Sequence, residues 1–190
     1  MKRFQHHCSR VIAFGSILAA LLITAGAQAQ TCPSYPIALP AQLLASVPTN
    51  TVITDIYNGA DAGSFGWLSW TGDPSEAALE TSLTAPGDSS SYTNPDDATD
   101  HEINAGDWVT ARGGVPNRSS MRGVLDNLLD VDIIVPIFDD VRVTGGTVAY
   151  HVAGFAQVRL IDYRLPSQNK ITVLFLGFTD CSSGDGGPNV

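Results

Sequence analysis

The sequence has very little cysteine and, through its first half, almost no positive charge. Only three cysteines occur in 190 residues, and no Lys or Arg lies between Arg10 and Arg112, although eleven acidic residues fall in that span. Nucleic acid and anionic lipid require clustered Lys and Arg, so the chain is a poor candidate for binding either. No CxxC motif and no paired histidines accompany Cys32 or Cys181, which argues against a zinc site there.

A long apolar run is present only near the N-terminus. Val11–Thr24 is almost wholly apolar, Lys2, Arg3 and Arg10 precede it, and Ala27-Gln28-Ala29 follows it with a small-x-small pattern. These three parts predict a signal peptide over residues 1–29 and therefore a secreted or cell-surface protein. The run is shorter than the roughly 20 residues of a spanning helix, so we expect no stable transmembrane segment.

Cleavage after Ala29 changes the composition of the chain. Removing 29 residues from 190 leaves 161, enough for one domain at 30–181 with a tail at 182–190. Three of the ten basic residues leave with the signal, so seven remain against nineteen acidic ones, a formal net charge of −12. Cys8 also leaves, and the remaining Cys32 and Cys181 predict one disulfide, with two free thiols as the alternative. Closing so long a loop contributes about 4–5 kcal/mol in the chain-entropy model.

Hydrophobic periodicity predicts a mainly β domain with one or two short helices, an α+β fold being the alternative. Apolar alternation and turn residues favour an antiparallel meander at the end of the chain, with a hairpin turn at Gly145-Gly146. We expect a compact antiparallel barrel or sandwich closed by the disulfide. The expected strands are Thr51–Tyr57, Ser64–Trp70, Asp107–Ala111, Ile133–Phe138, Val141–Thr144, Thr147–Tyr163 and Ile171–Phe178. The candidate positions for these helices are Ala41–Ser46, Ser75–Leu83 capped by Ser75, and Met121–Leu129 capped by Ser119 or Ser120.

An acidic loop offers the only set of residues that suits a metal ion. Its hard oxygen ligands within a short span are of the kind that Ca²⁺ prefers, although their spacing is not that of an EF-hand. The residues are Asn94, Asp96, Asp97, Asp100 and Glu102. We therefore keep a calcium-stabilised loop as a hypothesis beside the alternative of a solvated acidic loop.

Two further groups of residues admit a functional interpretation. Trp67, Trp70 and Trp108 could form an aromatic platform for glycans, or could pack in the core. His101 and His151 are the histidines of the mature chain, and a hydrolase could use either one with a neighbouring Asp and a serine. No serine stands in a GxSxG motif, so an exposed histidine is the simpler interpretation.

Five short blocks follow one another between Cys32 and Cys181. They are Ser64–Trp70, Gly72–Glu76, Asn94–Asp97, Gly106–Val109 and Tyr150–Ala156. Together they resemble an extracellular module of bacterial Tad/Flp pilus-assembly TadG-like proteins and of multi-repeat surface proteins. The family often has Gly where this chain has Ser167, and Asn where it has Ser64. The resemblance implies a surface-associated structural or adhesive role, and it carries over no catalytic residue.

The leading hypothesis is therefore a non-enzymatic secreted or cell-surface structural or adhesive module. An extracellular hydrolase and a small carbohydrate-binding domain are the alternatives. The partner is an unidentified surface or matrix component, and a second copy of the chain is another candidate, because an open strand edge can pair with its like.

Overall fold

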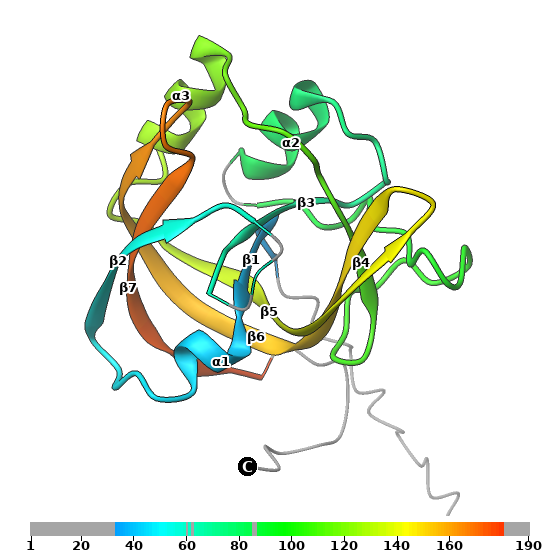
Figure 1. The fold of residues 1–190 in the computed structure, drawn as a ribbon, viewed down its shortest axis with the longest axis horizontal. Coiled ribbons are helices and arrows are strands. Elements are labelled where there is room, and N and C mark those ends of the chain that lie inside the picture. The colour runs from blue at the N-terminus through cyan, green and yellow to red at the C-terminus, as the bar shows by residue number, and fades with distance from the viewer. Residues whose placement is uncertain (1–32, 60, 62, 85–86, 181–190) are drawn as a thin grey trace, which may run out of the picture.

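The computed structural model describes residues 33–59, 61, 63–84 and 87–180 (Figure 1). The predicted signal peptide, Cys32, Cys181 and the predicted tail lie outside these residues. The elements follow in the order β1 (Ile37–Pro40), α1 (Ala41–Leu44), β2 (Thr51–Tyr57), β3 (Gly66–Ser69), α2 (Glu76–Leu83), β4 (Trp108–Ala111), α3 (Ser119–Asp126), β5 (Asp132–Thr144), β6 (Thr147–Arg164) and β7 (Lys170–Thr179). The mainly β class is confirmed.

The last three strands form the antiparallel meander that the sequence predicts. Gly145 and Gly146 join β5 to β6 with φ angles of 59° and 86°, which glycine adopts without strain and which match a type I′ hairpin turn. Thr144 pairs with Thr147 across this turn. Apolar alternation along β6 predicts one buried face, and of its six residues Val148 is half-buried while Tyr150, Val152, Ala156, Val158 and Leu160 are buried.

The sheet is mixed, which corrects the expectation of a wholly antiparallel barrel or sandwich. Its seven strands run in the order β2-β7-β6-β4-β3-β1-β5, and β5 also pairs with β6. The parallel pairing is that of β1 with β5, through Leu39–Ile137 and Pro40–Phe138. Strand β1 was not among the expected strands, and periodicity does not record whether a strand pairs in parallel or antiparallel. The described strands form one sheet without clear closure into a barrel.

Two clusters of buried side chains form the core. One contains Trp67 with Leu125 and Phe175, and the other contains Trp70 with Tyr92 and Tyr150. All four residues of β3 are buried, so this strand lies between the two clusters and is covered on both faces. At Gly66 an added Cβ would lie 2.4 Å from the ring of Tyr150, so the close approach of that ring requires glycine.

Two of the three described helices lie together on one side of the molecule, with α1 on the opposite side (Figure 1). Helix α2 begins as predicted, because the Ser75 hydroxyl accepts the Ala78 N–H. Helix α3 begins at Ser119 after Arg118, and neither Ser119 nor Ser120 caps it by its side chain. The carboxylate of Glu76 in α2 accepts the N–H groups of Asn117 and Arg118 instead. None of the helices in the described ranges is long and apolar enough to cross a membrane.

The Glu76 carboxylate therefore links α2 to the start of α3. Partial burial alone would raise its pKa, but the two backbone N–H groups and the charges of Arg112 and Arg118 outweigh it and hold the pKa below the ordinary value. A carboxylate with a lowered folded pKa stabilises the fold above its unfolded pKa. That contribution is lost as the pH falls through the folded value.

We expect Glu76→Gln to lower the free energy of unfolding at neutral pH by about 1 kcal/mol, the usual cost of a lost helix cap. For a chain of this length the melting temperature then falls by about 2–4 °C. The difference in stability between the variant and the unchanged protein should shrink as the pH drops below about 4.3. There the glutamate of the unfolded chain protonates before that of the folded protein. Thermal melts measure both effects. Glu102→Gln, at an exposed loop position, is the control, and an equal effect of the two variants would contradict the linking role.

Candidate functional site

Asn94 organises the acidic loop from within. Its side chain is buried, and Nδ2 donates to Asp100 Oδ2 at 3.0 Å and to Asp107 Oδ1 at 3.1 Å. Its Oδ1 accepts the Asp96 N–H at 3.0 Å. One amide thus holds two carboxylates close together and fixes the turn that follows it. Because the acceptors are charged, these hydrogen bonds are stronger than neutral ones.

A second contact attaches the acidic loop to the β5–β6 hairpin. Arg142 Nη1 donates to Asp96 Oδ2 at 2.8 Å, and Nη2 donates to Asp96 Oδ1 at 2.5 Å. The guanidinium also lies 4.3 Å from the centre of the Trp108 ring. The hydrogen bonds from Arg142 hold the pKa of the Asp96 carboxyl below its usual range. Asp96 therefore serves as an anchor for the loop.

The pKa of the Asp107 carboxyl shifts in the opposite direction from that of Asp96. Burial raises its pKa, and the nearby charge of Asp100 adds to the rise, while the Asn104 N–H and His151 act against it. Burial also raises the pKa of the Tyr92 phenol, whose hydroxyl donates to the Trp108 carbonyl at 2.9 Å. The inner end of the loop is thus a partly dehydrated acidic environment.

The five predicted calcium ligands do not converge on one point. Asp97 accepts hydrogen bonds from Thr99, while Asp96 is paired with Arg142, and Asp100 is held by Asn94. Glu102 is exposed. Within the described ranges, no group of three or more His, Cys, Asp or Glu is placed to hold a metal ion. The missing positive charge is supplied by Arg142, so calcium stays a hypothesis without a formed site.

The two histidines make separate contacts. His101 Nδ1 lies 3.0 Å from the Tyr92 carbonyl, which makes it part of the loop structure. His151 Nδ1 lies 2.6 Å from Asp139 Oδ1, and its ring packs 5.2 Å from the ring of Trp108. A hydrolase would also need a nucleophile beside one of these rings. No Ser or Thr hydroxyl of the described residues is hydrogen-bonded to His151, and the Thr93 hydroxyl, 3.3 Å from His101 Nδ1, shares that nitrogen with the Tyr92 carbonyl.

The predicted aromatic platform is wrong for two of its three tryptophans. Trp67 is fully buried and donates from Nε1 to Asn169 Oδ1 at 3.2 Å, while Trp70 is only 2% exposed. Both follow from the position of β3 between the two core clusters. Trp108 is half-buried beneath Arg142. Three rings in these positions cannot offer a shared flat surface to a glycan chain.

Arg112, which the sequence did not mark as a functional residue, lies in a pocket. Arg112 follows β4, is 8% exposed, and lines a pocket of about 420 Å³. Its Nη1 donates to the Gly114 carbonyl at 3.2 Å, but its buried Nε has no hydrogen-bond partner. Burial lowers its pKa, and the charge of Glu76 partly compensates. The sequence signal was its isolation, since it is the first basic residue after Arg10.

Several other residues that line the Arg112 pocket are glycines, whose backbone is not covered by a side chain. There are four, from separate segments, namely Gly59, Gly72, Gly113 and Gly146. Asn58, Thr110 and Tyr150 add polar side chains, and the Tyr150 hydroxyl donates to the Gly59 carbonyl at 2.9 Å. No acidic residue lines this pocket. Its geometry therefore suits binding of an anionic group.

Comparison with known proteins gives no relative, because no family model, no curated protein and no solved structure matches the chain.

We expect Asn94→Asp to destabilise the fold at neutral pH by about 2–3 kcal/mol. The change removes two donors and places a third carboxylate beside Asp100 and Asp107. Chemical denaturation measures the loss, and the deficit should shrink at low pH as these carboxyls protonate. Asn127→Asp adds the same charge at an exposed position and is the control.

The same measurements, repeated with calcium and with a chelator, test the calcium hypothesis on the unchanged protein. A ligand that binds only the folded state raises the melting temperature. An identical midpoint in both conditions would contradict a stabilising calcium ion.

Proposed function

We propose that the chain is a non-enzymatic secreted or cell-surface module with a structural or adhesive role, which binds a carboxylate of its partner in the Arg112 pocket. The observation that carries this proposal is a buried arginine in the lining of a pocket, whose Nε has no hydrogen-bond partner. The resemblance to TadG-like modules points to the same kind of role.

The energetic argument starts from the cost of burying an unpartnered polar group. Such a group costs about 1–3 kcal/mol, and more when it is charged. Arg112 forms no ion pair among the described residues, although six other ion pairs occur there. A carboxylate in the pocket would accept hydrogen bonds from Nε and Nη2. These two groups form the edge of the guanidinium that does not bind the Gly114 carbonyl. Binding would thereby remove a cost already present in the unbound protein.

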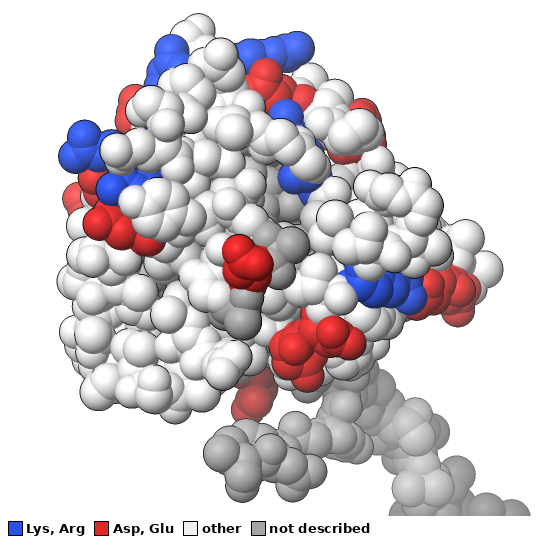
Figure 2. Space-filling view, viewed as in Figure 1, with Lys and Arg blue, Asp and Glu red and all other residues white. Residues whose placement is uncertain are grey.

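The charge distribution of the protein favours recognition of a single anionic group. On the face drawn in Figure 2, Lys and Arg lie in small separate groups, most of them beside acidic residues, and much of the surface carries no charge. The mature chain has a formal net charge of −12, which repels polyanions at long range. One carboxylate, from an acidic side chain or from a chain end, fits this balance better than a multiply charged phosphate.

The export signal and the disulfide belong to the same proposal. Ser34 forms a bridge with Ile134 of β5, and Thr179 pairs with Phe155 of β6, the strand next to β5. Both ends of the described chain therefore join neighbouring parts of one sheet. This supports a bond between Cys32 and Cys181 that closes the module, and a sheet whose pairings return from β5 to β6 supports a compact, closed shape.

We expect the exported protein to begin at Gln30 and to carry no reactive thiol. Intact-mass measurement should show no uptake of an alkylating reagent before reduction and two alkyl groups after it. Uptake of two groups without reduction would contradict the disulfide. A retained Met1 in protein recovered from outside the cell would contradict cleavage.

For the Arg112 pocket, we expect N-acetylglycine to produce saturable NMR shifts at Thr110, Gly113 and Tyr150, which line it. The uncharged amide of the same compound should produce none. A capped peptide with one internal glutamate distinguishes a side-chain carboxylate from a chain end. Equal shifts from the acid and the amide would contradict the proposal.

The matched variants are Arg112→Met and Arg164→Met, the second at an exposed arginine. Arg112→Met should abolish the shifts and change the melting temperature little, because removing an unpartnered buried group offsets the lost attraction to Glu76. Arg164→Met should retain them. A large loss of stability in Arg112→Met would indicate that Arg112 has a structural role instead.

A further inference from the structure

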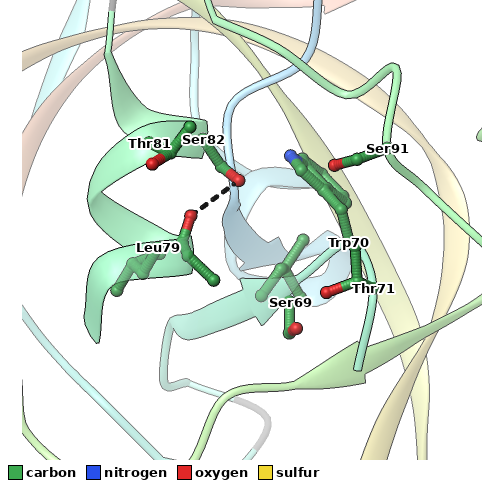
Figure 3. A pocket seen from close by; sticks show the side chains of 9 residues that line it. Ser69, Trp70, Thr71, Leu79, Thr81, Ser82 and Ser91 are labelled. Carbon is green, nitrogen blue, oxygen red and sulfur yellow. Dashed lines mark hydrogen bonds between the residues drawn. The ribbon is translucent and has the colours of Figure 1, made fainter. Parts of the chain in front are cut away.

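A second pocket lies between strand β3 and helix α2, and it differs in character from the Arg112 pocket. It has a volume of about 170 Å³ and is lined by Leu68, Ser69, Trp70, Thr71, Ala78, Leu79, Thr81, Ser82 and Ser91. Figure 3 shows α2 on one side and Trp70 on the other, with Ser91 beside the indole. No charged side chain lines it.

The indole N–H of Trp70 is the unusual group in this pocket. Trp70 is 2% exposed, yet its Nε1 has no hydrogen-bond partner. In Figure 3 the nitrogen lies at the edge of the ring on the side of Ser82, so it points into the space between strand and helix. A buried donor with no acceptor costs about 1–3 kcal/mol. An occupant that accepts a hydrogen bond would remove this cost.

The hydroxyl groups of the lining complement that donor. The Ser82 hydroxyl donates to the Ala78 carbonyl at 3.0 Å, and the Thr81 hydroxyl donates to the Ala77 carbonyl at 3.0 Å. The Ser69 hydroxyl donates to the Asp73 carbonyl at 2.8 Å. Their protons are therefore committed, and what they offer to an occupant is lone pairs. The pocket thus presents the Trp70 N–H as a buried donor and the oxygens of Ser69, Thr81 and Ser82 as acceptors, and the Thr71 hydroxyl, which accepts the Asp73 N–H, can donate its own proton.

An occupant must match this set of groups and the size of the pocket. A hydroxyl both accepts and donates, so a hydroxyl-bearing molecule can accept from Trp70 Nε1 and donate to a lining oxygen such as Ser82 Oγ. Without a charged residue in the lining, an ion would lose its hydration without compensation. A cavity of about 150 Å³ holds a six-membered ring such as benzene, which sets the scale of the ligand. Leu68 and Leu79 provide apolar surface for its carbon atoms.

We propose that the pocket between β3 and α2 binds a neutral, hydroxyl-bearing ligand the size of one sugar ring, with Trp70 Nε1 as the donor. Trp70 acts through the edge of its ring, so the flat aromatic platform is not involved. Thr71, Thr81 and Ser91 are exposed and form the mouth, while Ser69 and Trp70 lie at the inner end. The site is independent of the Arg112 pocket and does not rest on the carboxylate proposal.

The test follows the indole N–H resonances of the exported protein while methyl glycosides of glucose, galactose, mannose and N-acetylglucosamine are added. Trp70→Phe identifies the resonance of Trp70 by its loss. We expect at least one glycoside to shift this resonance saturably, with a Kd of about 1 mM or tighter. The Trp108 indole resonance should not move. No saturable shift with any of the glycosides would mean that water alone occupies the pocket, and would overturn the proposal.

Two serine variants test the role of the lining hydroxyls. Ser82→Ala should weaken the affinity about fivefold or more through the loss of one acceptor. Ser119→Ala changes a serine outside the pocket and should leave the affinity unchanged. Unchanged affinity in Ser82→Ala would overturn the proposed site even if a glycoside binds elsewhere. Because Ser82 lies on α2 and is only half-buried, this variant stays informative if Trp70→Phe fails to fold.

The source of the sugar is distinguished by comparing each active methyl glycoside with oligosaccharides that carry the same sugar at the end or in the middle. A one-ring pocket predicts that a terminal sugar binds as well as the free glycoside. Binding of the internal sugar alone would contradict a pocket of this size.

Discussion

Strand β6 is the element on which the rest of the sheet depends. It has eighteen residues, and one of its edges pairs with β5 from Asp132–Arg159 to Thr144–Thr147. The other edge is shared, because β4 pairs with residues 149–151 and β7 with residues 155–164. Register shifts interrupt the pairing on both sides, as bulges do where a long strand bends. Every other strand is placed by β6 directly or through one or more strands between.

This arrangement explains which features the sequence could predict. Local signals were sufficient for the hairpin at Gly145-Gly146, for β2 at Thr51–Tyr57, and for the Ser75 cap. Each depends on neighbours within a few residues, so periodicity and turn chemistry contain it. The parallel pairing of β1 with β5 joins residues about a hundred positions apart, and no local pattern records it. The same holds for the start of α3, where Glu76 replaces the expected serine cap from 41 residues away.

The functional residues divide in the same way. The acidic loop was recognisable from its composition, but its chemistry was not, because Arg142 neutralises Asp96 from a distant hairpin. Trp67 and Trp70 attracted attention as aromatic residues, whereas their burial depends on how β3 is covered. The open edge that suggested self-association is less regular than expected. In β2, Asp55 has a φ of 57° at a register shift and pairs with Lys170, and such a bulge with charged residues disfavours edge-to-edge pairing.

Both pockets flank one short pair of strands, and this has a physical reason. Leu68 pairs with Ala111, and Ser69 pairs with Thr110. Trp70 is the residue directly after β3, and Arg112 is the residue directly after β4. Where each of these short strands ends, the chain turns while core side chains still surround it. Its next side chain is then buried before the backbone reaches solvent. Trp70 Nε1 and Arg112 Nε have no partner in the described chain, and each lies beside a pocket.

Packing alone gives no reason to keep two such donors unpartnered, because an apolar residue of similar size would avoid the cost. Unpartnered donors at the walls of two pockets are instead what ligand binding requires, since each can satisfy its hydrogen-bonding potential only when another molecule enters. The two pockets differ in charge. The Arg112 pocket has a cation in its lining, whereas the pocket beside Trp70 is lined by neutral groups. If both proposals hold, one module built on β3 and β4 would contact a partner through two chemically distinct groups.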